Sequence, residues 1–352
     1  MIVPKYAAQD LIIWASSILR TCDIPPHDAD ETARLLVRSD LRGHGTHGLV
    51  RLKSYLERLK DGSFNPKPNL VLSQKGASWT LDADGALGQV VGSYILNAAR
   101  PFLQNEPLLW INVHRTGHLG ALGVLALEAA EAGFICLLGQ RTPPILGLPG
   151  FQRPAIGHNP FAFSAPIGSG QAPFVFDMAC SVVARGQILL AARDGRTIPD
   201  NWALDTQGEP TDNADAALAG MLQPSGGFKG MGIAMMIECM AAAFGAEPEA
   251  AKTTSMKLPT SGAVGRERAF FLFLNPAIAG DANAFTDYMR HWINYYIESG
   301  DSESRVPGQR GDAIQIHCDK DGIFYPASVD AELQILGESL GIIFPNPIST
   351  KL

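Results

Sequence analysis

Hydrophobic residues recur at helical spacing in several parts of the chain, most regularly after Thr46. Leucine and tyrosine residues follow Thr46 on one helical face, arginine and lysine residues lie between them, and Gly62 stands where such a helix would end. The same spacing predicts further amphipathic helices at residues 6–21, 28–38, 121–132, 284–299 and 329–342. A last helix, from Met231 to Ala246, is apolar on every side and is therefore predicted to be buried.

Short apolar runs, separated by glycine-rich turns, predict strands between these helices. The runs are SWTLDA, LLWINV, FICLLG, PFAFSAPI, PFVFDMACS, FFLFLNP and AIQIHC. Because helices and strands are interspersed and no repeat is present, the pattern predicts a mixed α/β protein. At 352 residues the chain is expected to form two or three lobes, and its last helix to pack on the helices near the N-terminus.

Composition narrows the range of partners. The formal charge is −7 and the basic residues are scattered, so no nucleic-acid partner is expected. Five cysteines without a CxxC pair favour neither a disulfide framework nor a thiolate zinc site, and they suit a reducing cytosol. The N-terminus has the pattern of an amphipathic helix rather than a signal peptide, and no stretch is long and apolar enough for a membrane span. We therefore expect a cytoplasmic protein without a membrane partner.

The densest group of polar residues lies in and just after the sequence LRGHGTHG. It contains Arg42, His44, Thr46, His47 and Arg51. In a helix that begins near Thr46, His47 and Arg51 stand four residues apart on one face, with Cβ atoms about 5–6 Å apart. Histidine exchanges protons near neutral pH and a guanidinium matches a carboxylate, so the pattern favours a proton donor beside a carboxylate clamp. The alternative is a solvated elbow in which Thr46 caps the helix.

Two further segments place glycine at the start of a predicted helix. HRTGHLG leads from a strand into the helix at 121–132, and PSGGFKGMG carries Lys229 into the apolar helix. Backbone N–H groups that glycine leaves accessible suit a phosphate or a carboxylate. Neither segment is a Walker A loop and the chain has no GxGxxG, so a dinucleotide site must be of another kind. The alternative is a tight strand-to-helix turn for the first segment and a flexible turn with a solvated lysine for the second.

Asp177 ends the apolar run PFVFD, and a buried aspartate needs a partner. An imidazole or an arginine is the natural partner; otherwise the carboxylate caps a following helix. A zinc site formed by His44, His47, His114 and His118 is another alternative, and would make the protein a hydrolase. No cysteine or carboxylate pattern joins these histidines, and HExxH is absent.

Six segments, taken in order, resemble the type 2 malate/L-lactate dehydrogenase family. They are SDLRGHGTHGLVRLKSYLERLKDG, HRTGHLGALG, GHNPFAFSAP, FDMACSVVARGQI, PSGGFKGMGIAM and VPGQR. The family includes ureidoglycolate and sulfolactate dehydrogenases, diketogulonate reductases, and reductases of Δ1-piperideine-2-carboxylate and Δ1-pyrroline-2-carboxylate. The resemblance implies an oxidoreductase of a small carboxylate that uses NADP or NAD, with NADPH favoured, and that forms a homodimer.

The resemblance also implies a fold and a set of site residues. The fold is an NAD(P)-binding mixed-sheet domain unlike the Rossmann fold, at 71–324, with a mainly helical domain formed by both termini, at 1–70 and 325–352. His47 is the implied general acid/base, with Thr46 and Asp177 as its relay, while Arg51 and His44 bind the substrate. The implied cofactor contacts are His118, Leu119, Gly120, Ala121, Leu122, Asp177, Met178, Ala179, Ser181, Lys229, Gly230, Gly308, Gln309 and Arg310. No metal is implied.

Three positions depart from the common pattern of the family. Thr46 stands where serine is frequent, His158 where threonine is frequent, and Met231 where tyrosine is frequent. The extra methyl group of Thr46 narrows the pocket, which favours a flat cyclic 2-imino acid as the acceptor of hydride at C2. The alternative is a 2-hydroxy acid dehydrogenase that acts on malate, L-lactate or a related acid. In both reactions His47 would move the proton that accompanies hydride transfer.

Overall fold

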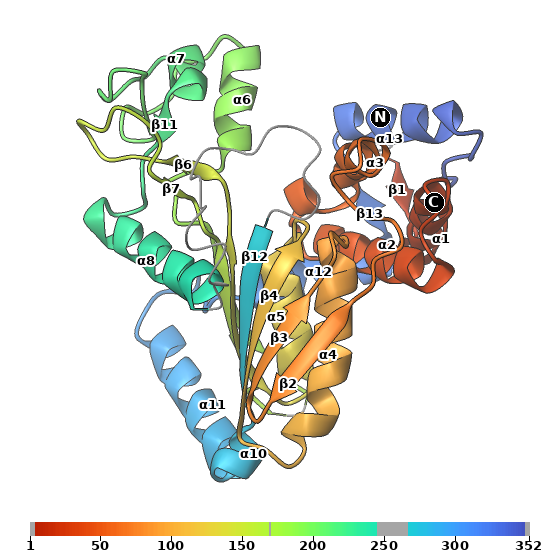
Figure 1. Ribbon diagram of the computed structural model, residues 1–352, viewed down its shortest axis with the longest axis vertical. Coiled ribbons are helices and arrows are strands. Elements are labelled where there is room, and N and C mark those ends of the chain that lie inside the picture. Colours follow the sequence, from red (N-terminus) through yellow and green to blue (C-terminus); the bar gives the residue numbers. More distant parts are fainter. Residues whose placement is uncertain (1–3, 169, 245–266, 349–352) are drawn as a thin grey trace.

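The computed structural model describes residues 4–168, 170–244 and 267–348. A seven-stranded sheet runs through the middle of the molecule (Figure 1). Its strands, in spatial order, are β2 (Val71–Lys75), β3 (Ser78–Asp82), β4 (Leu108–Thr116), β12 (Glu267–Leu274), β5 (Ile135–Arg141), β8 (Phe161–Ala165) and β9 (Phe174–Met178). Neighbours β3 and β4 are parallel and the other neighbours are antiparallel, so the sheet is mixed.

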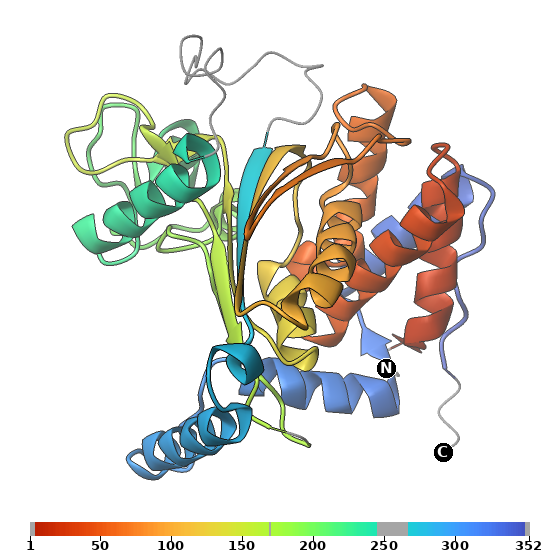
Figure 2. The ribbon, with the colours of Figure 1, turned by 60° about the horizontal axis from the view of Figure 1, so that its bottom comes forward.

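Strand β12 lies at the centre of the sheet because its side chains are apolar on both faces. Phe271 and Phe273 are fully buried in the core under α4 (Gly88–Leu103) and α5 (Leu122–Glu131). Phe270 points to the opposite face, where it contacts residues of α8 (Phe228–Glu238) and of the π-helical turn Cys239–Ala243. Alternate residues of a strand face opposite sides, so this run of phenylalanines joins two layers of helices. Figure 2 shows α4 and α5 on one side of the sheet and α8 on the other.

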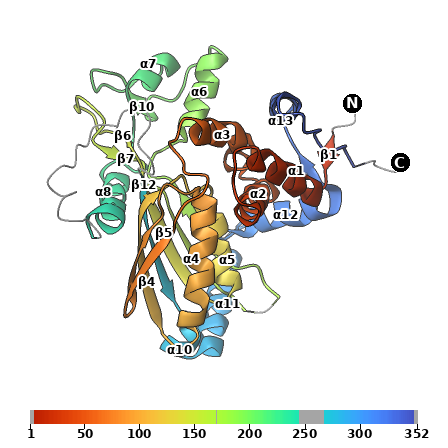
Figure 3. The ribbon, with the colours of Figure 1, turned by 45° about the vertical axis from the view of Figure 1, so that its right-hand side comes forward.

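The two termini meet in a separate group of helices, seen side by side in Figure 3. The group contains α1 (Ala8–Arg20), α2 (Pro26–Leu41), α3 (Leu52–Lys60) and α13 (Ala327–Ser339), and β1 (Lys5–Tyr6) pairs there with β13 (Ile323–Phe324). Their apolar faces share one core. The predicted helices at 6–21, 28–38 and 329–342 and the packing of the last on the first are therefore confirmed.

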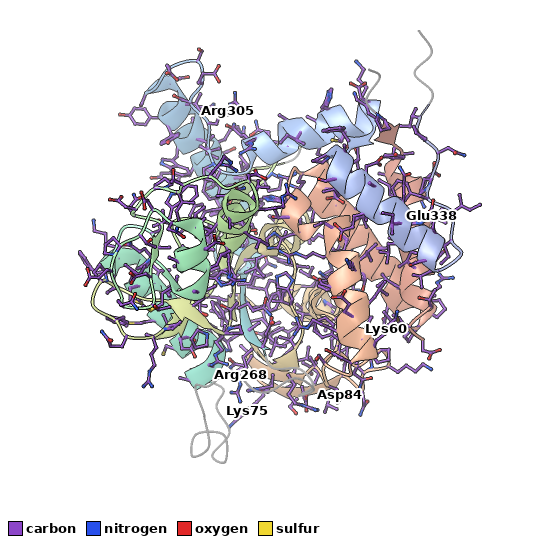
Figure 4. The ribbon with its side chains drawn as sticks, turned by 90° about the horizontal axis from the view of Figure 1, so that it is seen from above. Lys60, Lys75, Asp84, Arg268, Arg305 and Glu338 are labelled. Carbon is purple, nitrogen blue, oxygen red and sulfur yellow. The ribbon has the colours of Figure 1, made fainter. Side chains whose placement is uncertain are left out.

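A third apolar core lies beyond the edge of the central sheet. It contains the four-stranded sheet β10–β11–β6–β7, which is formed by Ala203–Leu204, Met221–Leu222, Pro144–Leu146 and Ile156–Gly157. Helices α6 (Arg185–Arg193) and α7 (Ala214–Ala219) and one face of α8 complete it. The chain then continues through α10 (Pro276–Ala279), α11 (Ala282–Glu298) and α12 (Gln309–Asp321). From above, the labelled Arg305 lies beside α11, on the side away from Lys75 and Asp84 (Figure 4).

The described structure corrects two predicted elements. AIQIHC is not a strand but part of helix α12: Gly308 and Gly322 have positive φ angles at its two ends, and Ile316 is 65% exposed, so the alternating pattern does not reflect burial. The apolar helix after Lys229 is not buried all round, since Met235 and Met236 are 56% and 43% exposed. Both errors arise because neighbours in space, which no local pattern reveals, decide which face is covered.

Other expectations are met. The remaining predicted strands and the helices at 121–132 and 284–299 are present, and the five cysteines, all within the described residues, form no disulfide. Within the described ranges, no helix has both the length and the apolarity that crossing a bilayer requires. The boundaries 1–70 with 325–352 and 71–324 stay a prediction. The core of the terminal helices also includes Leu87, Val90 and Ile323 from beyond those limits.

A buried ion cluster joins α2 of the terminal helices to α5 of the sheet layer. Glu128 of α5 is 7% exposed and pairs with Arg34 and Arg38 of α2, the Arg38 contact being 2.8 Å long. Glu131, one turn later, pairs with the same Arg38 at 2.5 Å, but its side chain is 44% exposed. The cluster holds the last turns of α2, which lead directly into the polar loop after Arg42, against α5.

We expect Glu128→Ala to lower the free energy of unfolding by about 2–3 kcal/mol. Removal of Glu128 takes the shared buried carboxylate from both arginines; Arg34 keeps Glu31 and Arg38 keeps Glu131 as more exposed partners, which limits the loss. Glu131→Ala, the matched control on the same helix, should cost less than about 1 kcal/mol because its ion pair is solvated. Urea unfolding followed by circular dichroism measures both values. Equal losses for the two variants would show that the buried cluster does not hold the layers together.

Candidate active site

His47 lies in a pair of short 3₁₀ turns, Gly45–His47 and Leu49–Arg51, that precede α3. The predicted start of the helix near Thr46 is therefore wrong, because α3 begins only at Leu52. The side chains still converge. The Thr46 hydroxyl lies 2.9 Å from Nδ1 of His47, and the Arg51 Nε–H donates to the carbonyl oxygen of Thr46 at 2.6 Å. The turn thus keeps the side chains of Thr46, His47 and Arg51 together, although the helix from which their proximity was predicted is absent.

A second imidazole, that of His118, stacks on His47. The ring centroids are 5.6 Å apart and the planes are 27° from parallel. Nδ1 of His118 lies 2.8 Å from the hydroxyl of Tyr55, which also accepts a hydrogen bond from Nε2 of Gln89. The sequence placed His118 among the cofactor contacts and did not anticipate its position against His47.

The histidine rings are neutral at pH 7. Burial lowers the pKa of His47 to about 4, and the nearby charges of Arg51, His44 and His158 lower it further in that order. Burial also holds the pKa of His118 well below its usual range, with His47 and Arg51 as the next causes. Arg51 forms no ion pair with a carboxylate among the described residues. An uncompensated guanidinium therefore stands beside two neutral imidazoles, an arrangement that suits an anionic ligand.

The backbone around His118 is clamped by a buried amide. Oε1 of Gln140 accepts a hydrogen bond from the Leu119 N–H at 3.1 Å, and Nε2 of Gln140 donates to the Gly117 carbonyl at 2.9 Å. The same Nε2 donates to Glu267 at 2.6 Å. Burial raises the pKa of Glu267 to about 7. Sequence reasoning missed Gln140 and Glu267. The polar pair Gln140-Arg141 at the end of an apolar strand could have indicated a buried polar contact there.

A cavity of about 240 Å³ brings together several predicted cofactor residues. Its lining includes His44, Asp177, Gly308 and Arg310. Burial lowers the pKa of His44, and the charges of Arg42 and Arg310 act in the same direction. Segments far apart in the sequence therefore meet at one cavity.

Asp177 has a different partner from the one predicted. Its Oδ2 accepts a hydrogen bond of 2.7 Å from the backbone N–H of Gly123, in the first turn of α5. Burial raises its pKa to about 6, and this hydrogen bond opposes the rise. Neither an imidazole nor an arginine hydrogen-bonds to it among the described residues. The carboxylate caps a helix that precedes it in the chain, which the expectation of a following helix did not foresee.

The other predicted cofactor segments lie against the end of β9. Ser181 bridges to Pro224, and the Ser225 N–H donates to the Cys180 carbonyl at 2.8 Å. This contact holds the loop that leads to Lys229 and Gly230, at the start of α8, against Ser181. Ser181 Oγ is buried and has no hydrogen-bond partner among the described residues. A Cβ on Gly230 would lie 2.2 Å from the Ser225 carbonyl, so this tight turn requires glycine.

The remaining predicted cofactor residues flank the same region. Leu119, Gly120, Ala121 and Leu122 connect His118 to α5, and Gly120 has a positive φ of 79°. Gln309 closes its own turn, its Oε1 accepting from the Val306 N–H at 3.0 Å. Together these residues surround the N-terminus of α5, where the Asp177 carboxylate already accepts the Gly123 N–H.

His158 lies near a threonine hydroxyl, and the alternative zinc site has no ligand group among the described residues. Nδ1 of His158 lies 3.1 Å from the hydroxyl of Thr142, and burial lowers the pKa of His158 to about 4. In the part of the chain that the structure describes, no three histidine, cysteine or acidic side chains form a group able to hold a metal ion. The zinc hydrolase alternative therefore gains no support from the described residues.

Comparison with known proteins finds similar sequences along nearly the whole chain. The malate/L-lactate dehydrogenase family matches residues 6–334. Over 302 residues the chain is 29% identical to a (2R)-3-sulfolactate dehydrogenase (NADP(+)) of Chromohalobacter salexigens (86% of this chain, 89% of the relative). It is 32% identical to a ureidoglycolate dehydrogenase (NAD(+)) of Escherichia coli K12, also over 302 residues (84% and 85%).

Solved structures share the fold. The sulfolactate dehydrogenase of Methanocaldococcus jannaschii superposes with a TM-score of 0.84 at 26% identity, over 97% of this chain and 98% of the other. A Δ1-piperideine-2-carboxylate reductase of Pseudomonas syringae pvar. tomato gives 0.79 at 26% identity, over 94% and 99%. The match over nearly the whole chain shows that the protein belongs to the malate/L-lactate dehydrogenase family and is an NAD(P)-dependent oxidoreductase.

Proposed function

We propose that the protein is an NAD(P)-dependent 2-hydroxy acid dehydrogenase. The observation that carries the proposal is the Arg51 guanidinium, which has no carboxylate partner among the described residues and stands beside His47 and His118. Most named relatives in the family act on 2-hydroxy acids, which favours this alternative over the cyclic 2-imino acid predicted from Thr46. The reductase of Δ1-piperideine-2-carboxylate among the structural neighbours keeps the imine as the second candidate.

Arg51 is suited to hold the carboxylate of the acid. Its Nε–H is used by the Thr46 carbonyl, which leaves the two terminal nitrogens of the guanidinium for a bidentate contact. The anion would offset the charge of Arg51, and this charge is one cause of the lowered pKa of His47. Substrate binding therefore raises the pKa of the imidazole that is to exchange the proton.

His47 is suited to move the proton of the C2 hydroxyl group. In the tautomer that donates from Nδ1 to the Thr46 hydroxyl, Nε2 carries the lone pair and accepts the proton during oxidation. In the reverse direction the protonated ring returns the proton to the developing alkoxide. We place Asp177 with the cofactor residues rather than in a relay, because its hydrogen bond goes to Gly123.

The residues around the 240 Å³ cavity and the end of β9 are suited to hold NAD(P). The unpartnered hydroxyl of Ser181 and the Arg310 side chain at the cavity offer hydrogen-bond donors for a dinucleotide. When bound, the cofactor supplies or accepts the hydride at C2. We propose that this site lies in a mixed sheet and does not use the parallel doubly wound arrangement, since one strand pair in the central sheet is parallel.

We also propose that the protein is a homodimer. Large apolar side chains are exposed on α11, where Tyr288 and Tyr295 are each 73% exposed and Trp292 is 41% exposed. Met235 of α8 is 56% exposed, and Figure 1 shows α8 and α11 on the same side of the central sheet. Apolar surface gathered in this way is typical of a protein interface. Light scattering of the purified protein measures the mass of the assembly, and a monomer would contradict the proposal.

The proposed function is tested by a paired depletion assay with NADH and NADPH. The acceptors are pyruvate, oxaloacetate, sulfopyruvate, Δ1-pyrroline-2-carboxylate and Δ1-piperideine-2-carboxylate. We expect turnover of at least one 2-oxo acid, and the ratio of the two rates shows the cofactor preference, with NADPH expected to be favoured. Turnover of the cyclic imines alone would establish the second candidate. Absence of turnover with every acceptor would contradict both.

His47→Asn should lower kcat by about 10²–10⁴-fold, the usual contribution of general acid–base catalysis, and leave the affinity for NAD(P)H nearly unchanged. His118→Asn is the matched variant, since the two rings are stacked and both are held through Nδ1. We expect it to weaken binding more than it slows proton transfer. Steady-state kinetics and fluorescence titration with NADPH separate the effects. If His118→Asn loses turnover and His47→Asn does not, the two roles are exchanged.

The pH dependence should differ between the two directions. Oxidation requires neutral His47, whose pKa is about 4 in the free protein, so kcat/KM for the hydroxy acid should be constant near neutrality and fall as the pH approaches 4. Reduction requires the protonated ring, so kcat/KM for the oxo acid should fall as the pH rises above that pKa. Profiles measured in both directions test this. An oxidation rate that falls already between pH 7 and 6 would contradict a neutral His47.

A further inference from the structure

The carboxyl group of Asp40 lies beneath the turn that carries His47. Asp40 is in the last turn of α2 and is 7% exposed. Its Oδ2 atom accepts hydrogen bonds from the backbone N–H of Leu49, at 2.9 Å, and from the hydroxyl of Tyr325, at 2.8 Å. Its Oδ1 atom has no hydrogen-bond partner among the described residues. Asp40 thus fastens the backbone two residues beyond His47 while lying outside the group of side chains that faces the substrate.

Gly48 allows the turn to lie directly on this carboxyl group. A Cβ on Gly48 would be 1.7 Å from Oδ1 of Asp40 and 2.2 Å from its carboxyl carbon. Both atoms belong to a short, buried side chain that has little freedom to move away. The carboxyl group therefore occupies the space where any larger residue following His47 would place its side chain. The position of the turn depends on the pair formed by Asp40 and Gly48.

Tyr325 holds the carboxyl group from the far end of the chain. It directly follows β13, is 5% exposed and lies in the core of the terminal helices, where its ring centroid is 6.3 Å from that of Tyr6. Burial, and then the adjacent Asp40, hold the pKa of Tyr325 well above its usual range, so its hydroxyl stays protonated and donates. The turn around His47 is thereby connected to the C-terminal part of the chain.

The contacts of Asp40 depend on an acceptor oxygen rather than on a charge. Both donors, the Leu49 amide and the Tyr325 hydroxyl, are neutral, and no cation pairs with the carboxyl group within the described residues. Burial raises its pKa to about 7. The amide oxygen of asparagine has the same shape and can accept the same two hydrogen bonds. Alanine leaves the Leu49 N–H without its acceptor.

We propose that Asp40 is a positioning residue for the reaction: its carboxyl group, held by Tyr325, fixes the Gly48–Leu49 backbone and thereby aims the imidazole of His47. The proposal rests on the proposed function for its kinetic part. A displacement of about 1 Å at a catalytic group can lower turnover by about 10²-fold. Loss of the anchor should therefore reduce kcat much more than it changes the cofactor site, most of which is formed by other segments.

The test compares Asp40→Ala, Asp40→Asn and the control Ser39→Ala in the full-length protein. Ser39 is the buried neighbour of Asp40, and its hydroxyl bonds only to the Leu35 carbonyl within the same helix. We expect Asp40→Ala to lower kcat by about 10²-fold, with less than a twofold change in the affinity for NADPH. Asp40→Asn should restore kcat to within about fivefold of the wild type, and Ser39→Ala should not differ from it.

Hydrogen exchange gives a readout that does not require activity. The Leu49 N–H loses its acceptor in Asp40→Ala, so a peptide covering residues 43–51 should exchange at least about tenfold faster than in the wild type or in Asp40→Asn. If no acceptor in the depletion assay is turned over, the proposed function fails, yet this measurement still tests the anchor. If the wild type is active and Asp40→Ala is equally active, the positioning role alone fails.

Two further outcomes decide the matter. If Asp40→Asn is as inactive as Asp40→Ala while exchange in 43–51 is unchanged, the carboxyl group itself moves a proton and the positioning role is overturned. If Asp40→Ala cannot be purified, Tyr325→Phe and Gly48→Ala perturb the same contact from its two sides. Each should then lower kcat more than the affinity for NADPH, with faster exchange in 43–51, and wild-type kinetics in both would contradict the proposal.

Discussion

The candidate site depends on one electrostatic constraint: Arg51, which has no counter-ion among the described residues, lies next to two half-buried imidazoles. Arg51 is held by the Thr46 carbonyl, and the rings of His47 and His118 stack within the same group. Burial and the positive charge both favour the neutral form of the rings. A carboxylate bound to Arg51 offsets part of the electrostatic cost of protonating the rings. His47, which exchanges the proton, therefore becomes more basic when the substrate is bound. Binding and proton transfer are then parts of the same interaction.

Two buried carboxyl groups fix the backbone segments that carry the two imidazoles. Asp40 lies under the Gly48–Leu49 backbone, and Glu267 orients Gln140, which clamps the residues on both sides of His118. Each carboxyl group comes from a different layer, the first from α2 and the second from the central strand β12. The contact between the stacked rings therefore depends on how the terminal helices pack on the sheet, which the Glu128 cluster helps to maintain.

Local sequence patterns predicted most of the helices and strands. They failed where tertiary contacts determine the secondary structure. The strands around Phe271 have apolar side chains on both faces and were predictable from sequence alone. The alternating isoleucines of helix α12 led to the prediction of a strand. They are not both buried, so their alternation does not mark a face of a sheet. The helix expected from Thr46 begins only at Leu52. The Leu49 N–H is bound to the Asp40 carboxyl group instead of to a carbonyl of a preceding helical turn.

In the candidate site, too, contacts between neighbours in sequence were predictable and contacts between distant residues were not. His47, Thr46 and Arg51 are neighbours in sequence, so their proximity followed from spacing, even though the helix that suggested it is absent. The stacking of His118 on His47 and the anchor formed by Tyr325 join residues far apart in the chain, and no local pattern reports such contacts. The predicted partner of Asp177 was wrong for the same reason, because Gly123 reaches it from another element.

The coupling of Arg51 to His47 can be measured through the pKa of His47, by NMR titration of histidine-labelled protein with and without oxamate, an unreactive carboxylate. The His47 signal is assigned from the spectrum of His47→Asn. We expect the pKa of His47 to be about 4 in the free protein, and to rise clearly both with oxamate bound and in Arg51→Met. A pKa near the ordinary 6.5 in the free protein, or one that neither change moves, would contradict the coupling of Arg51 to His47.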